Sequence, residues 1–160
     1  MRWKSVVGIS GVAIALVTAG CSAAPTSGNA SKDGGDSVSV ALRLVDGVGL
    51  TLVDQAGDTL YYADQERDGV VHCFDACVHF WVPIMVASGA TPRAAASLAG
   101  DLSTINRPDG MVQVAYDGKP LYRFTQDEGP GRLRGNGVTD TFDGLEFRWR
   151  VATADGVGAP

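Results

Sequence analysis

The stretch that decides the fold is VQVAYDGKPLYRFTQDEGPG (residues 112–131). Apolar and polar residues alternate on both sides of Asp117-Gly118, a dipeptide that favours the tight turn of a β-hairpin. An earlier stretch has the same order of strand, glycine turn, Leu-Tyr strand, acidic turn and glycine: LTLVDQAGDTLYYADQERDG (residues 50–69). The sequence therefore predicts duplicated hairpins in one small β-rich domain.

Further strands and two short helices are expected around these hairpins. Residues 38–45 and 145–151 alternate apolar and polar side chains, as half-buried antiparallel strands do. In the second of these strands we expect one buried face, formed by Leu145, Phe147, Trp149 and Val151. Residues 94–98 and residues 71–80 are the helix candidates. The predicted fold class is mainly β and antiparallel, with one or two short helices.

The N-terminus has the features of an export signal. Residues 1–20 comprise a basic start, a short apolar run and small residues directly before Cys21. The apolar run is shorter than the roughly 20 residues that a membrane span needs. The small residues and Cys21 resemble a bacterial lipobox, in which the cysteine is lipidated and becomes the first mature residue. We therefore expect an extracytoplasmic protein anchored to the cell membrane by lipid on Cys21; an ordinary signal peptide with an unrelated cysteine is the alternative.

Composition divides the rest of the chain into three parts. Residues 21–37 have almost nothing to bury and are expected to be a disordered tether. Residues 38–153 are the β-rich domain, and residues 154–160 are a tail. The whole chain has 13 basic and 18 acidic residues and a formal charge of −5, which argues against nucleic acid as a partner.

The cysteines form one closely spaced pair once Cys21 is set aside. Cys73 and Cys77 lie within HCFDACVHFW (residues 72–81), and disulfides persist outside the cytoplasm. On a helix over residues 71–80, residues i and i+4 have Cα atoms about 6.2 Å apart, which suits a disulfide. The spacing has one residue more than the usual redox motif Cys-x-x-Cys, so a structural disulfide is favoured over a catalytic dithiol.

The two histidines leave a metal site as an alternative. On the same helix, His72, Asp75 and His79 share the face opposite the cysteines, so the four Cys and His side chains do not converge as zinc requires. The smaller hypothesis is a surface metal site formed by His72, Asp75 and His79, and a solvated helix face is the other interpretation. No phosphate loop, nucleophile elbow, zinc-protease helix or calcium loop is present in the sequence.

Several of these residues also match a family pattern. Tyr122, Phe124 and Asp127 form the motif Tyr-x-aromatic-x-x-Asp, and the first hairpin keeps Tyr61 but has Ala63 and Glu66 at the other two positions. Cys73, Cys77 and Trp81 add a Cys-x-x-x-Cys-x-x-x-Trp spacing. The chain thereby resembles the bacterial "secreted repeat of unknown function" family of predicted lipoproteins. The resemblance implies an exported, often lipid-anchored β-rich domain and implies no activity.

The expected function is therefore non-catalytic. We expect a binding or scaffolding domain at the cell envelope, held to the membrane by its lipid, with no cofactor and with a protein or ligand partner that the sequence does not name. The alternative is a metal-binding or thiol-redox accessory protein of the envelope. For Tyr61 and Tyr122, packing in a half-buried sheet is favoured over ligand binding by a tyrosine pair.

Overall fold

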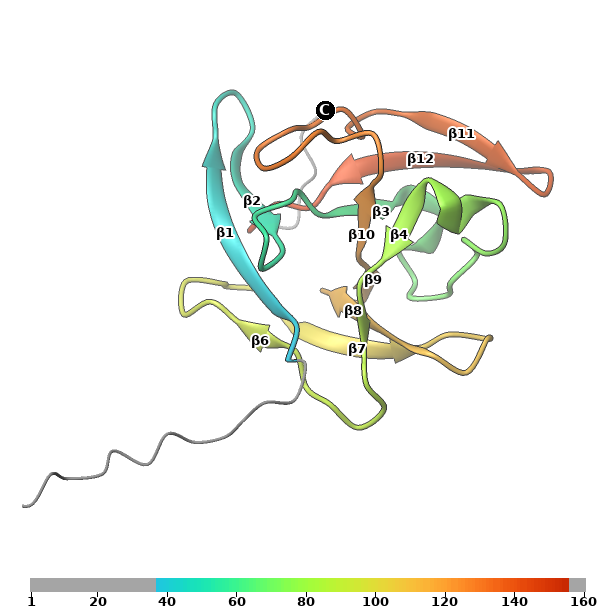
Figure 1. The fold of residues 1–160 in the computed structure, drawn as a ribbon, viewed down its shortest axis with the longest axis horizontal. Helices are drawn as coiled ribbons and strands as arrows, with labels where there is room; N and C mark the ends of the chain where they lie inside the picture. Colours follow the sequence, from blue (N-terminus) through green and yellow to red (C-terminus); the bar gives the residue numbers. More distant parts are fainter. Residues whose placement is uncertain (1–36, 156–160) are drawn as a thin grey trace, which may run out of the picture. The chain divides into compact units, whose positions relative to one another are not determined.

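The computed structural model describes residues 37–155, which form twelve short strands and two 3-10 turns (Figure 1). The mainly β, antiparallel fold class is confirmed. Cys21, the predicted lipid site, lies outside the described residues, as do the predicted signal segment and most of the predicted tether. In chain order the elements are β1 (Ser39–Val45), β2 (Gly49–Val53), β3 (Tyr61–Ala63), η1 (Asp64–Glu66), η2 (Cys77–His79), β4 (Trp81–Pro83), β5 (Met85–Val86), β6 (Arg93–Ala94), β7 (Leu102–Asn106), β8 (Val112–Tyr116), β9 (Lys119–Pro120), β10 (Tyr122–Phe124), β11 (Thr139–Phe142) and β12 (Leu145–Val151).

These strands form three sheets. The largest has the order β11-β12-β3-β10-β4 and is antiparallel throughout. A second has the order β5-β8-β7, with β9 also paired to β8, and a third has the order β2-β1-β6. Asp117 and Gly118 both have positive φ, 48° and 74°, as the predicted tight turn between β8 and β9 requires.

Both predicted helices are wrong. Residues 71–80 contain only the 3-10 turn η2, because Asp75 has a φ of 45°, a left-handed conformation that a right-handed helix does not accommodate. Residue 94 is the last residue of β6, which pairs with β1. The Arg93 N–H, also in β6, donates to the Val38 carbonyl at 2.8 Å. Long-range pairing therefore overrides the local helical pattern.

The predicted duplication is realised as a pseudo-two-fold arrangement. β3 and β10 pair antiparallel with Tyr61 opposite Tyr122, the equivalent tyrosines of the two hairpins. β12 lies on the outer side of β3, and β4 lies on the outer side of β10. Trp149 on β12 and Trp81 on β4 are therefore equivalent positions.

Backbone hydrogen bonds repeat across the same axis. In the first half, Leu60 N–H donates to Leu52 O at 2.9 Å, Leu52 N–H to Ala152 O at 2.8 Å, and Ala152 N–H to Leu60 O at 2.8 Å. In the second half the same triangle joins Leu121 N–H to Val114 O at 2.9 Å, Val114 N–H to Ile84 O at 2.8 Å, and Ile84 N–H to Leu121 O at 3.0 Å. The first hairpin thus bonds to the segment at Ala152, and the second hairpin bonds to the segment at Ile84. Each of these segments lies outside the hairpin that it contacts.

An aromatic stack lies on this axis. The ring centroids of Trp81 and Trp149 are 3.9 Å apart and the rings are nearly parallel, and the Phe124 ring also stacks on Trp81, with centroids 4.2 Å apart. Such pairs contribute about 0.5–1.5 kcal/mol each beyond the area that they bury. The predicted inner face of β12 is buried at Phe147, Trp149 and Val151, but Leu145 is 38% exposed because it lies at the β11–β12 turn.

Candidate functional site

The tyrosine of the first repeat and the aspartate of the second repeat form an internal contact. The Tyr61 hydroxyl on β3 donates to Asp127 Oδ2 at 2.6 Å, and Asp127 Oδ1 accepts the Arg134 N–H at 2.9 Å. The ring of Tyr61 is fully buried. Burial, followed by the hydrogen bond and the charge of Asp127, raises the pKa of Tyr61 well above its usual range. The first-copy tyrosine therefore binds the second-copy acid.

The equivalent contact in the other half involves Glu66. Its Oε1 accepts the N–H groups of His72 at 2.6 Å and Cys73 at 2.8 Å, and Tyr122 lies beside its carboxyl group. Within residues 37–155, neither Glu66 Oε2 nor the Tyr122 hydroxyl has a partner with hydrogen-bond geometry. Burial raises the pKa of Glu66, and the His72 N–H, Tyr122 and the Cys73 N–H partly oppose that rise. Glu66 thus holds the start of the disulfide loop.

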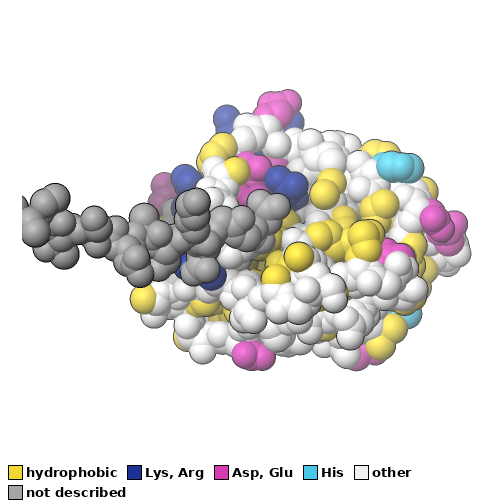
Figure 2. Space-filling view, turned by 60° about the horizontal axis from the view of Figure 1, so that its bottom comes forward, with side chains coloured by type: hydrophobic (Ala, Val, Ile, Leu, Met, Phe, Trp, Pro, Cys, Tyr) yellow, Lys and Arg dark blue, Asp and Glu magenta, His cyan; other side chains and the backbone are white. Residues whose placement is uncertain are grey.

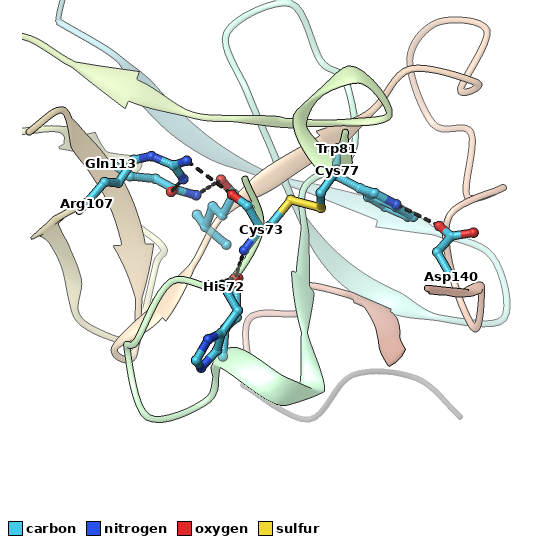
Figure 3. Close-up of a disulfide and its surroundings, with 9 residues drawn as sticks. His72, Cys73, Cys77, Trp81, Arg107, Gln113 and Asp140 are labelled. Atoms are coloured by element: carbon cyan, nitrogen blue, oxygen red, sulfur yellow. Dashed lines mark hydrogen bonds between the residues drawn. A yellow bond between two sulfur atoms is a disulfide. The ribbon is translucent and has the colours of Figure 1, made fainter. Parts of the chain in front are cut away.

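Cys73 and Cys77 form the expected disulfide, although not on a helix. Their Cα atoms are 5.3 Å apart, and both residues are fully buried. The disulfide lies between two polar contacts, which come from different parts of the chain (Figure 3). On one side the Cys73 carbonyl accepts from Arg107 Nη2 at 3.1 Å, and on the other Trp81 Nε1 donates to Asp140 Oδ2 at 2.9 Å.

Arg107 is the centre of a buried polar network that the sequence did not reveal. Its Nη1 donates to Gln113 Oε1 at 2.6 Å, and Gln113 Nε2 donates to the Leu121 carbonyl at 2.8 Å. The guanidinium also lies 5.0 Å from the centre of the Phe74 ring, a cation–π contact. The available sequence signal was Gln113, a polar residue within the apolar run of β8. Nothing in the local sequence marks Arg107 as buried.

The three proposed metal ligands are not brought together. His72, Asp75 and His79 are all exposed, and the imidazole of His72 points away from the disulfide in Figure 3. In the part of the chain that the structure describes, no group of three or more His, Cys, Asp or Glu side chains is arranged to hold a metal ion. The expected three-ligand face depended on a continuous helix, and the left-handed Asp75 interrupts it.

A mainly apolar groove lies next to the disulfide loop. It has a volume of about 790 Å³, and it runs between the loop at residues 74–79, the strands β4 and β5, and the end of the β7–β8 hairpin. We call it the edge groove. Its lining is Phe74, Asp75, Ala76, Val78, His79, Val82, Pro83, Met85, Arg107, Asp109 and Met111. Figure 2 shows hydrophobic side chains gathered on one face of the molecule, with acidic and histidine side chains around them.

Comparison with known proteins supports the resemblance seen in the sequence. The model of a family described as "Secreted repeat of unknown function" matches residues 103–145, a segment that contains Tyr122, Phe124 and Asp127. Searches among curated proteins and among solved structures found no match. The resemblance is confirmed over this segment, and a secreted family is consistent with an extracytoplasmic location. Among residues 37–155, no helix has the length and apolar character needed to cross a membrane.

Proposed function

We propose that this chain is a non-catalytic extracytoplasmic domain that binds a partner at the cell envelope through the edge groove, while lipid on Cys21 holds it to the membrane. The observation that carries the binding role is the groove itself, about 790 Å³ and lined mainly by apolar side chains. Met111 in its lining is 51% exposed. Exposed apolar surface next to a concave site is typical of surfaces that bind a partner.

The internal contacts support a binding role over a redox role. The disulfide is fully buried, whereas cysteines that take part in thiol–disulfide exchange must be accessible to the attacking thiol. Tyr61, Asp127, Glu66 and Arg107 are all engaged in contacts between segments of the domain. These ionisable side chains therefore stabilise the fold, and the edge groove is the surface that remains for binding a partner.

A fluorescent probe tests the proposed site. The exported Cys21→Ala protein is titrated with 1-anilinonaphthalene-8-sulfonate, which becomes fluorescent in apolar sites. We expect a saturable signal that Met111→Asp abolishes, because the new carboxylate places a charge in the apolar lining. Leu44→Asp is the matched control, since Leu44 is an apolar residue on β1, is 72% exposed and lies outside the groove. No saturable signal, or an equal loss in both variants, would overturn the proposed function.

A further inference from the structure

The edge groove runs beside an open strand edge. Thr125 N–H donates to Phe80 O at 2.9 Å, and Ile84 N–H donates to Leu121 O at 3.0 Å. The backbone groups of Phe80 and Ile84 therefore point towards β10 and the residues next to it. Because alternate residues of a strand direct their backbone groups to opposite edges, those of Trp81, Pro83 and Met85 point away from β10. Trp81 is fully buried and Pro83 has no N–H, so Met85 is the one of these three residues with an outward N–H that is not fully buried. β4 and β5 are each the last strand of their sheet, and no strand among residues 37–155 pairs with this outer edge.

The other half of the domain shows what occupies the equivalent edge. Trp149, the counterpart of Trp81, donates its N–H to Val138 O at 2.9 Å and accepts the Gly137 N–H at 2.9 Å. β11 continues this pairing along residues 145–148 of β12. An extended segment of the chain itself therefore covers the outer edge of β12.

The first half has no such segment. The chain between Glu66 and Trp81 is shorter than the chain between Asp127 and Trp149, and it forms the disulfide loop instead of a hairpin. By this equivalence the covered residues 145–149 correspond to residues 77–81, directly before and at the start of β4, and no strand among residues 37–155 pairs there. The half that contains β12 therefore has an extended strand on its outer edge, and the half that contains β4 has this edge unpaired within the described residues.

The lining of the groove suits an extended peptide. Val82, Pro83 and Met85 contribute to it from the edge strand, while Phe74 and Val78 contribute from the disulfide loop. Side chains that alternate along a bound strand would meet this apolar surface at every second position. Asp75 is exposed in the lining of the groove, and its carboxylate favours a Lys or Arg side chain in the bound segment.

We propose that a partner protein binds here through an extended segment that adds a strand to the outer edge of β4 and β5. Alternate apolar side chains of that segment lie in the edge groove, and a basic residue lies near Asp75. Backbone hydrogen bonds hold the segment, and the groove selects its side chains. Pro83 offers no N–H to the added strand, so at this position the strand is held through the Pro83 carbonyl alone. This inference rests on the proposed function and specifies its ligand.

The test uses a phage-displayed library of random linear dodecapeptides, selected on the immobilised, exported Cys21→Ala protein. We expect recovered peptides to alternate apolar residues and to bind Met85→Pro about tenfold more weakly, because that change removes an outward N–H. Met85→Ala is the matched control, since it shortens the same side chain but keeps the N–H. Failure to recover peptides, or equal binding to wild type and Met85→Pro, would overturn strand addition.

A second measurement covers the case in which Met85→Pro does not fold. The strongest recovered peptide is N-methylated at one residue at a time, and strand addition predicts loss of binding at alternate residues only. Loss at every position, or at none, contradicts the inference. If the peptides fail while Met111→Asp still abolishes the fluorescent signal, the groove binds a different ligand and the proposed function stands. If both fail, the proposed function falls too.

Discussion

Tyr61 and Asp127 belong to different repeats, yet the tyrosine hydroxyl lies 2.6 Å from the carboxylate. The cross-strand partner of Tyr61 is Tyr122, which lies beside Glu66, the acid of the first repeat. The tyrosine of each repeat therefore meets the acid of the other. From the loop that follows it, Glu66 also accepts two backbone N–H groups and Asp127 accepts one. In this chain the motif residues thus form a contact that joins two copies, with both tyrosine side chains buried and Asp127 half-buried.

Tyr61→Phe should lower the free energy of unfolding by about 1.5–3 kcal/mol, the range for a hydrogen bond to a charged group. The change removes the donor to Asp127 and leaves that carboxylate with the Arg134 N–H. Urea unfolding followed by tryptophan fluorescence measures the loss. Tyr62→Phe is the control, because the contact of the Tyr62 hydroxyl within residues 37–155 is a long one, 3.5 Å to Arg67 Nη2. Equal losses in the two variants would contradict a specific role for Tyr61.

Glu66 should make the domain less stable as the pH rises. Burial raises the pKa of Glu66 in the folded state above its ordinary value of 4.5, so the folded protein holds this proton more tightly than the unfolded chain does. The resulting stability is fully present below the unfolded pKa and is lost as the pH rises through the folded pKa.

Glu66→Gln isolates this effect, because the amide stays neutral at every pH. We expect the two proteins to unfold at similar urea concentrations near pH 4 and the variant to be the more stable at pH 7. Asp127, whose pKa burial also raises, contributes with the same sign in both proteins and cancels in the difference. A difference that does not change with pH, or that changes in the wild type's favour as the pH rises, would contradict the assignment.

The disulfide should be closed in air and resistant to mild reductant. Both cysteines are fully buried, so we expect no free thiols in the native protein and reduction only after unfolding in urea. Replacing both cysteines by alanine should cost about 2 kcal/mol of stability, since the closed loop is short. Thiol counting with and without urea, together with unfolding of the double variant, checks this. Two reactive thiols in the native protein would favour the redox alternative.

Cys21→Ala should release the protein from membranes. The prediction follows from the sequence before residue 22, which lies outside the described residues. Fractionation of cells that express the wild type or the variant measures the protein in membrane and soluble fractions. Retention of the variant in membranes would refute a lipid anchor on Cys21. Cys73→Ala with Cys77→Ala is the control, because it removes cysteines without touching the proposed lipid site.

The sequence by itself predicted the mainly β class, the duplicated hairpins, the resemblance and the paired cysteines, because each follows from local patterns. Alternation of side chains along β12 and the positive φ that Asp117-Gly118 accepts depend only on neighbouring residues. The tertiary structure decided the rest: which tyrosine meets which acid, the burial of Arg107 against the Cys73 carbonyl, and the loss of the predicted helix at Asp75. The Tyr61–Asp127 and Arg107–Cys73 contacts join segments far apart in the chain, and local sequence carries no record of which distant group will satisfy a buried polar side chain.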